Sequence, residues 1–107
     1  TDIGIELTVP NPAWTIQISD LYENEETILV IAKINSKTSI TSQVITKISD
    51  TVEAKVQNPN KPIKYYVIGE KWSWHSKSNN IDFINSKDDI SSTINKAKPI
   101  KFNKKFL

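Results

Sequence analysis

The sequence predicts an all-β protein, an antiparallel β-sandwich of immunoglobulin-like architecture with at most one short helix, near residues 87–97. Stretches of β-branched and aromatic residues alternate with polar residues along most of the chain, which is the period of a strand with one buried face. Turns rich in proline and asparagine separate these stretches. The 107 residues suffice for a single domain, residues 1–107, that buries a core without disulfides. A small barrel is the alternative architecture.

Four strands are predicted in the first half of the chain, at residues 3–9, 14–19, 28–34 and 40–48. Pro10 and Pro12 form a rigid corner between the first two, because proline cannot donate a hydrogen bond to a ladder. The continuously apolar run at residues 28–34 is typical of a central strand. The apolar spacing at residues 40–48 also fits a helix, but threonine, valine and isoleucine dominate that window and favour a strand. Residues 20–26 are predicted to form an acidic turn or a helical half-turn.

The second half of the chain contains predicted strands at residues 52–57, 63–68, 81–84 and 100–103. Gly69 ends the aromatic strand before it, because glycine permits a backbone angle that other residues resist. Ser86 followed by Asp89 resembles the amino-terminal cap of a short helix. The segment from residue 95 to the end of the chain has five lysines and no acid. Its last few residues are expected to be a frayed basic tail.

The composition gives little support to catalysis. The chain has no cysteine, one histidine and two glycines, so thiol chemistry and glycine-rich phosphate loops are excluded. His75 lies in a polar stretch without a serine in a nucleophile motif, and it is read as a solvated loop residue. Glu23, Glu25 and Glu26 lack the spacing of a calcium loop and are expected to be solvated. No enzyme activity, cofactor or metal site is therefore predicted.

Charge is distributed unevenly along the chain. Residues 1–53 carry eight acids and three lysines, whereas residues 54–107 carry four acids and eleven lysines. The two halves are expected to pair with each other across the fold rather than to steer a partner. All basic side chains are lysine. Because arginine supplies the usual bidentate contacts to phosphates and guanine, the sequence argues against nucleic acid as a partner.

The candidate binding surface is the segment that follows Gly69. Trp72 and Trp74 are two residues apart, so a regular strand would place both rings on one face, with Lys71 on the other. Two interpretations stay open. The rings are buried between the sheets, or they form a rigid apolar anchor for a partner, rimmed by Glu70 and Lys71.

Two sets of residues carry a resemblance to known proteins. The segments NPAW at residues 11–14 and YYVIGEKWSW at residues 65–74 resemble small uncharacterised bacterial proteins with a similar glycine, lysine, tryptophan, tryptophan signature. More distantly, the arrangement is similar to chagasin-type inhibitors of cysteine peptidases. In that resemblance Asn11 and Pro12 match the first inhibitory loop and Trp72 the third. The chain has no glycine-rich middle loop and no arginine-proline pair.

The resulting functional prediction is a non-enzymatic binding or structural domain with a protein partner. Its predicted contact residues are Glu70, Lys71, Trp72, Trp74, Asn11 and Pro12. A chagasin-like inhibitor of papain-type peptidases is one alternative, and a carbohydrate-binding module is another. The sequence does not begin with methionine, so Thr1 follows either a cleaved export signal or a trimmed start. A secreted or periplasmic protein without a membrane span is expected.

Overall fold

The computed structural model describes residues 1–36, 44–69 and 80–104. Eight strands, one 3₁₀ turn and one α-helix follow in the order β1 (Asp2–Val9), β2 (Trp14–Glu23), β3 (Ile28–Ser36), β4 (Thr46–Ala54), β5 (Ile63–Gly69), β6 (Ile81–Ile84), η1 (Lys87–Ile90), α1 (Ser91–Asn95), β7 (Lys98–Pro99) and β8 (Phe102–Lys104). The all-β prediction is confirmed, as is a single short helical segment within residues 87–97.

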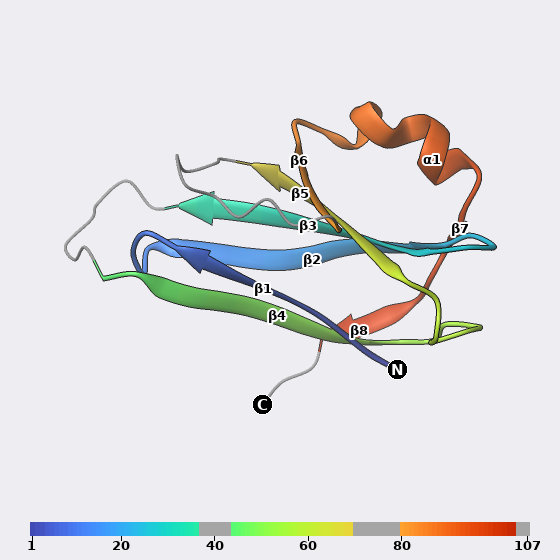
Figure 1. Ribbon diagram of the computed structural model, residues 1–107, viewed down its shortest axis with the longest axis horizontal. Coiled ribbons are helices and arrows are strands. Elements are labelled where there is room, and N and C mark those ends of the chain that lie inside the picture. Colours follow the sequence, from blue (N-terminus) through green and yellow to red (C-terminus); the bar gives the residue numbers. More distant parts are fainter. Residues whose placement is uncertain (37–43, 70–79, 105–107) are drawn as a thin grey trace.

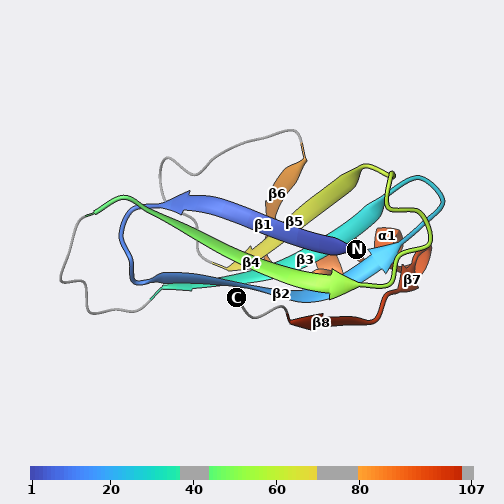
Figure 2. The same cartoon turned by 90° about the horizontal axis from the view of Figure 1, so that it is seen from below.

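Two sheets pack face to face in a sandwich-like arrangement (Figures 1 and 2). One sheet has three strands in the order β1-β4-β8, and the other has five in the order β6-β5-β3-β2-β7. The pairing is mainly antiparallel, as predicted. The β3–β5 and β5–β6 pairs, however, are parallel, so the larger sheet is mixed. The immunoglobulin-like topology stays a prediction.

The core between the sheets follows the alternation of the sequence. The buried side chains of β1 are every second residue, Ile3, Ile5, Leu7 and Val9. In β2 the alternation shifts after Ile18, where a β-bulge lies between Ile18 and Asp20, so that Leu21 and Glu23 face inwards instead of the even-numbered residues. The strand also continues to Glu23, which corrects the prediction of an acidic turn from residue 20.

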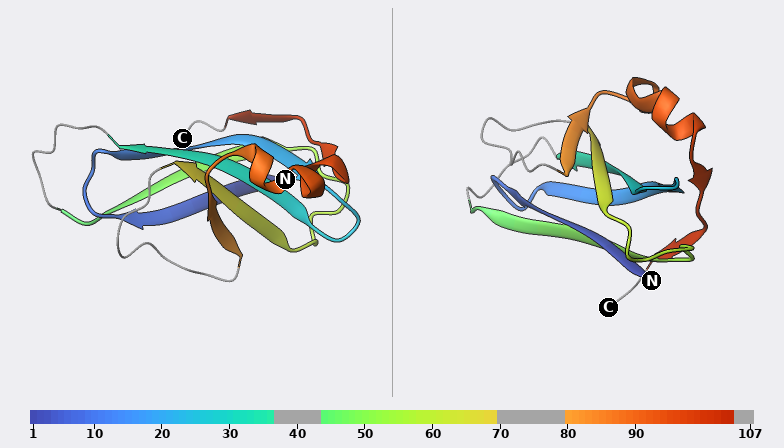
Figure 3. Two further views of the ribbon diagram at one scale, coloured as in Figure 1. Left: turned by 90° about the horizontal axis from the view of Figure 1, so that it is seen from above. Right: turned by 45° about the vertical axis from the view of Figure 1, so that its right-hand side comes forward.

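Strand β3 is buried on both faces. Ile28, Val30, Ala32 and Ile34 belong to the core between the sheets, whereas Leu29 and Ile31 are equally buried on the other face. The η1–α1 segment lies over that outer face of the larger sheet, and its Ile90 is buried (Figure 3). The apolar run therefore forms a central strand, as predicted.

The fourth strand differs from the prediction. Residues 44 and 45 lie outside any strand, and β4 runs without a break from Thr46 to Ala54, where the sequence suggested two separate strands. It pairs with β1 over its full length, from Val9 opposite Thr46 to Asp2 opposite Glu53. Residues 37–43 of the predicted strand are outside the described residues.

The two sheets are connected on both sides by side-chain hydrogen bonds to the backbone. On one side, the Tyr65 hydroxyl of β5 donates to the Gly4 carbonyl of β1 over 2.7 Å. On the other, the Asp50 carboxylate of β4 accepts from the Ile18 amide at the β2 bulge over 2.7 Å. The Lys104 ammonium donates both to that carboxylate and to the Ile18 carbonyl. These contacts fix the offset between the layers.

We expect Tyr65→Phe to lower the free energy of unfolding by about 1 kcal/mol, because it removes one half-buried hydrogen bond and leaves the ring in place. Urea unfolding measures the difference. Tyr66→Phe is the matched control, since no hydrogen bond of the Tyr66 hydroxyl joins the sheets within the described residues, and we expect it to change stability by less than about 0.5 kcal/mol. Equal effects of the two substitutions would contradict the bridging role of Tyr65.

Candidate functional site

The residues predicted to bind a partner are placed only in part. Glu70, Lys71, Trp72 and Trp74 lie outside the described residues, so their exposure stays a prediction. The third tryptophan of the sequence, Trp14 at the start of β2, is buried in the core.

The other two predicted contact residues, Asn11 and Pro12, lie in the corner between β1 and β2. Asn11 is 4% exposed, and its Oδ1 accepts a hydrogen bond from the Ala13 amide over 2.9 Å. This hydrogen bond stabilises the turn between β1 and β2. Pro12 is exposed. The geometry gives Asn11 a structural role and supplies no support for its direct contact with a peptidase.

Charge pairing between the halves of the sequence is confirmed at three positions. Lysines of the second half bind acids of the first half in the pairs Lys61–Glu23, Lys87–Asp20 and Lys104–Asp50. The pair at Glu23 is the most deeply buried of these, with side-chain exposures of 15% for the lysine and 8% for the glutamate. It lies at the end of the sandwich where β2 turns into β3.

Glu23 is the centre of a hydrogen-bond network that fixes this end of the molecule. Its carboxylate accepts from the backbone amides of Gln57 and Asn58 over 3.0 and 3.2 Å and from the Lys61 ammonium over 3.0 Å. Lys61 also donates to the Asn24 carbonyl over 2.7 Å. A carboxylate buried in this way must be matched by donors, since an unpaired charge in the interior is costly. The prediction that Glu23 is solvated is therefore wrong.

The pKa of Glu23 lies below its usual value of 4.5. The hydrogen bond from the Gln57 amide lowers this pKa most, and the donors Lys61 and Asn58 lower it further. These contacts outweigh burial, which acts in the opposite direction. Glu23 is therefore ionised at neutral pH, and its charge neutralises that of Lys61.

A cleft of about 570 Å³ opens beside this pair. We call it the lysine cleft, and its lining residues are Glu23, Asn24, Glu25, Lys55, Gln57, Lys61, Lys96, Lys98, Pro99, Ile100 and Lys101. Five lysines and two glutamates give the lining a formal balance of +3. It is formed by the β2–β3 turn, the chain after β4 and the segment around β7, at the right-hand end of Figure 1.

Four of these lysines are exposed. Within residues 1–36, 44–69 and 80–104, no ion pair involves Lys55, Lys96, Lys98 or Lys101. Like charges that share one cleft repel one another, and Glu25, the lining carboxylate that is not paired with Lys61, offsets only part of this repulsion. The cleft therefore attracts anions.

Backbone pairing holds these lysines in position. Strand β7 pairs with the end of β2, with Lys98 opposite Glu23. The Ile100 amide donates to the Leu21 carbonyl over 2.9 Å, and the Lys55 amide donates to the Lys101 carbonyl over 3.3 Å. The main chain at Lys55, Lys98 and Lys101 is thus attached to the two sheets by hydrogen bonds. These bonds fix the backbone positions from which the three lysine side chains extend.

Other types of site are not evident in the described residues. No group of three or more histidine, cysteine, aspartate or glutamate side chains within them is arranged to hold a metal ion. Nor does any helix in this part of the chain combine the length and apolar character needed to cross a membrane.

Comparisons with known proteins do not assign a family. No protein-family model matches the sequence, and neither curated proteins nor solved structures give a significant match.

Proposed function

We propose that this chain is a non-enzymatic binding domain that holds an acidic segment of a protein partner in the lysine cleft. The observation that carries the proposal is the set of four exposed lysines around one cleft that have no carboxylate partner within the described residues. Charge of one sign gathered in a concave surface raises the local concentration of oppositely charged ligands.

The chemistry of the lining favours carboxylates as the ligand groups. An ammonium group is a compact point charge on a flexible stem, so it can follow carboxylates at variable spacing. Planar recognition of phosphates usually relies on arginine, and the sequence contains none. The adjacent backbone amides of Gln57 and Asn58 beside the cleft already donate to the Glu23 carboxylate. An external anion is therefore bound by side-chain ammonium groups.

The predicted contact surface at Trp72 and Trp74 is a separate prediction, because these residues lie outside the described residues. The two surfaces make different predictions about the partner, since lysines select for charge and tryptophans for apolar groups. A contribution from the tryptophans stays part of the prediction from the sequence.

The double substitution Lys98→Glu, Lys101→Glu is expected to weaken binding of a fluorescein-labelled hexaglutamate peptide by about tenfold or more. Each exposed charge pair contributes up to about 1 kcal/mol, and reversal replaces attraction by repulsion. Fluorescence anisotropy measures the affinity. Because the contacts are exposed, raising the salt concentration from 50 to 300 mM should weaken wild-type binding as well.

Lys33→Glu combined with Lys64→Glu has the same change in net charge and serves as the control. Both lysines belong to the larger sheet and do not line the cleft. Near-wild-type affinity is expected for this control, and hexaglutamine should not bind to any of the proteins. A loss of affinity as large as that of the cleft variant would show that only overall charge matters, which would contradict the proposal.

A further inference from the structure

A second cleft adjoins the lysine cleft and differs from it in character. Its volume is also about 570 Å³, and Lys55 and Lys101 line both clefts. The hydrogen bond between the Lys55 amide and the Lys101 carbonyl places these residues side by side. The two clefts therefore adjoin at one lysine pair, and we call them together the track.

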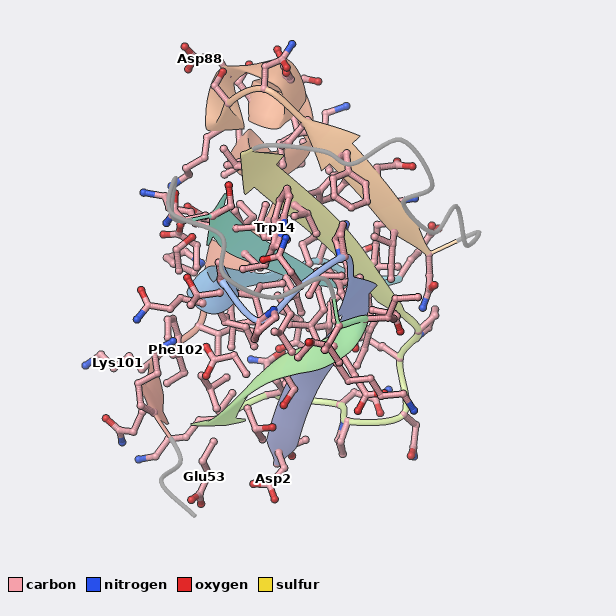
Figure 4. The ribbon with its side chains drawn as sticks, turned by 90° about the vertical axis from the view of Figure 1, so that its left-hand side faces the viewer. Asp2, Trp14, Glu53, Asp88, Lys101 and Phe102 are labelled. Carbon is pink, nitrogen blue, oxygen red and sulfur yellow. The ribbon has the colours of Figure 1, made fainter. Side chains whose placement is uncertain are left out.

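Beyond the lysine pair, the track becomes apolar and then acidic. Val56 and Phe102 line the second cleft and are only partly buried against the core. Glu53 lines it as well and is exposed. In Figure 4 the Lys101 side chain points away from the sheets, with Phe102 beside it and Glu53 at the lower edge. Glu53 repels a carboxylate, whereas the apolar side chains offer contact area to an aliphatic group.

We infer that the ligand of the track is an extended peptide in which a block of acidic residues is followed or preceded by an aliphatic residue. This inference rests on the proposed function of the lysine cleft. The acidic block lies over Lys96, Lys98 and the Lys55–Lys101 pair, and the aliphatic side chain lies against Val56 and Phe102. An extended chain can occupy both clefts at once, since a strand advances about 3.3 Å per residue.

Four labelled ligands of equal length test the inference in fluorescence anisotropy: octaglutamate, two peptides of six glutamates and two leucines, and octauridylate. The leucines are placed at either end in separate peptides, because both chain directions fit the track. We expect the better leucine peptide to bind wild type at least about fivefold more tightly than octaglutamate, because burying apolar area adds to the charge attraction.

Two variants separate the apolar contact with Phe102 from the charge repulsion by Glu53. Phe102→Ala should remove most of the preference for leucine while leaving octaglutamate affinity within about twofold. Glu53→Gln should instead raise the affinity for octaglutamate about twofold to threefold, because it removes a repelling carboxylate. Glu53 is exposed, so this variant keeps the test decisive if Phe102→Ala fails to fold.

The outcomes separate this inference from the proposed function. Equal affinities of wild type for octaglutamate and the leucine peptides would overturn the inference and leave anion binding in the lysine cleft intact. The same holds if Glu53→Gln leaves the affinity for octaglutamate, relative to the leucine peptides, unchanged. Absence of binding to any acidic peptide would overturn both. Tighter binding of octauridylate than of the leucine peptides would overturn the choice of a peptide ligand.

Discussion

Glu23→Ala is expected to lower the free energy of unfolding by about 3 to 5 kcal/mol, the usual effect of breaking a buried ion pair. The substitution leaves the Lys61 ammonium and the amides of Gln57 and Asn58 without the carboxylate that they share. The backbone of Glu23 also pairs with that of Lys98 in β7, so we expect the substitution to weaken the attachment of β7 to β2 as well. Urea or thermal unfolding of the purified protein measures this effect.

The coupling between Glu23 and Lys61 can be isolated with a double-mutant cycle. Glu23→Gln, Lys61→Met and the double variant give the interaction energy, which should exceed about 1 kcal/mol because the pair is buried. The pair Lys64–Asp82, which is more exposed than Lys61–Glu23 and has an N–O distance of 2.9 Å, is the control. Its interaction energy should lie below about 1 kcal/mol. Similar values for the two pairs would contradict a special role for Glu23.

The same carboxylate makes stability dependent on pH. Its pKa is lower in the folded protein than in the unfolded chain, so its contribution is complete above the usual value of 4.5 and is lost as the pH falls through the folded-state pKa. The difference in unfolding free energy between wild type and Glu23→Gln should therefore shrink as the pH is lowered from 6 towards 3. A constant difference over that range would mean that Glu23 is not held ionised by its donors.

Gly69→Ala is the second substitution with a large expected effect, a loss of about 3 kcal/mol of unfolding free energy. Gly69 ends β5 with φ of +135°, in a region that side chains with a Cβ rarely adopt. An added Cβ would also overlap the carbonyl oxygen of Ile34, the residue opposite in the parallel β3–β5 pair. The chain must therefore distort the end of the central strand to accept alanine.

The other glycine of the sequence provides a matched control. Gly4 lies within β1, its φ is not positive, and an added Cβ would approach the Thr51 hydroxyl oxygen at 3.1 Å. We expect Gly4→Ala to change the free energy of unfolding by less than about 1 kcal/mol, since lower entropy of the unfolded chain offsets the tight contact. Chemical unfolding measures the free energy of unfolding of both variants. Equal losses of unfolding free energy would argue against backbone strain at Gly69.

Most strands could be predicted because alternation is a local property. Residues 3–9 and 63–68 each show the alternation within one continuous segment, and both form strands. The unusual backbone angle at Gly69 could also be predicted locally, from the residue type, and it is confirmed. The parallel pairing of β5 with β3 and β6 could not be predicted, because strand direction depends on connections rather than on the strands themselves. The bulge after Ile18 could not be predicted, since it reverses the parity of the buried positions and the segment from Asp20 to Glu23 has an acid at each end.

The lysine cleft was also missed, although part of its signal is in the sequence. The run of lysines without acids after residue 95 is visible in the sequence, but the prediction there is a strand at residues 100–103 followed by a frayed basic tail, not part of a cleft. Only the fold brings Lys98 and Lys101 next to Lys55, which is more than 40 positions earlier in the chain. Glu23 was misread for a related reason: its donors follow β4 and are remote in sequence.

The most direct test of acidic-peptide binding in the lysine cleft is a nuclear magnetic resonance titration of isotope-labelled protein with unlabelled hexaglutamate. The largest backbone amide shifts should occur at Lys55, Lys98 and Lys101, and they should diminish as salt is added. Shifts confined to the segment with Trp72 and Trp74, or no shifts at millimolar peptide, would contradict binding in the lysine cleft.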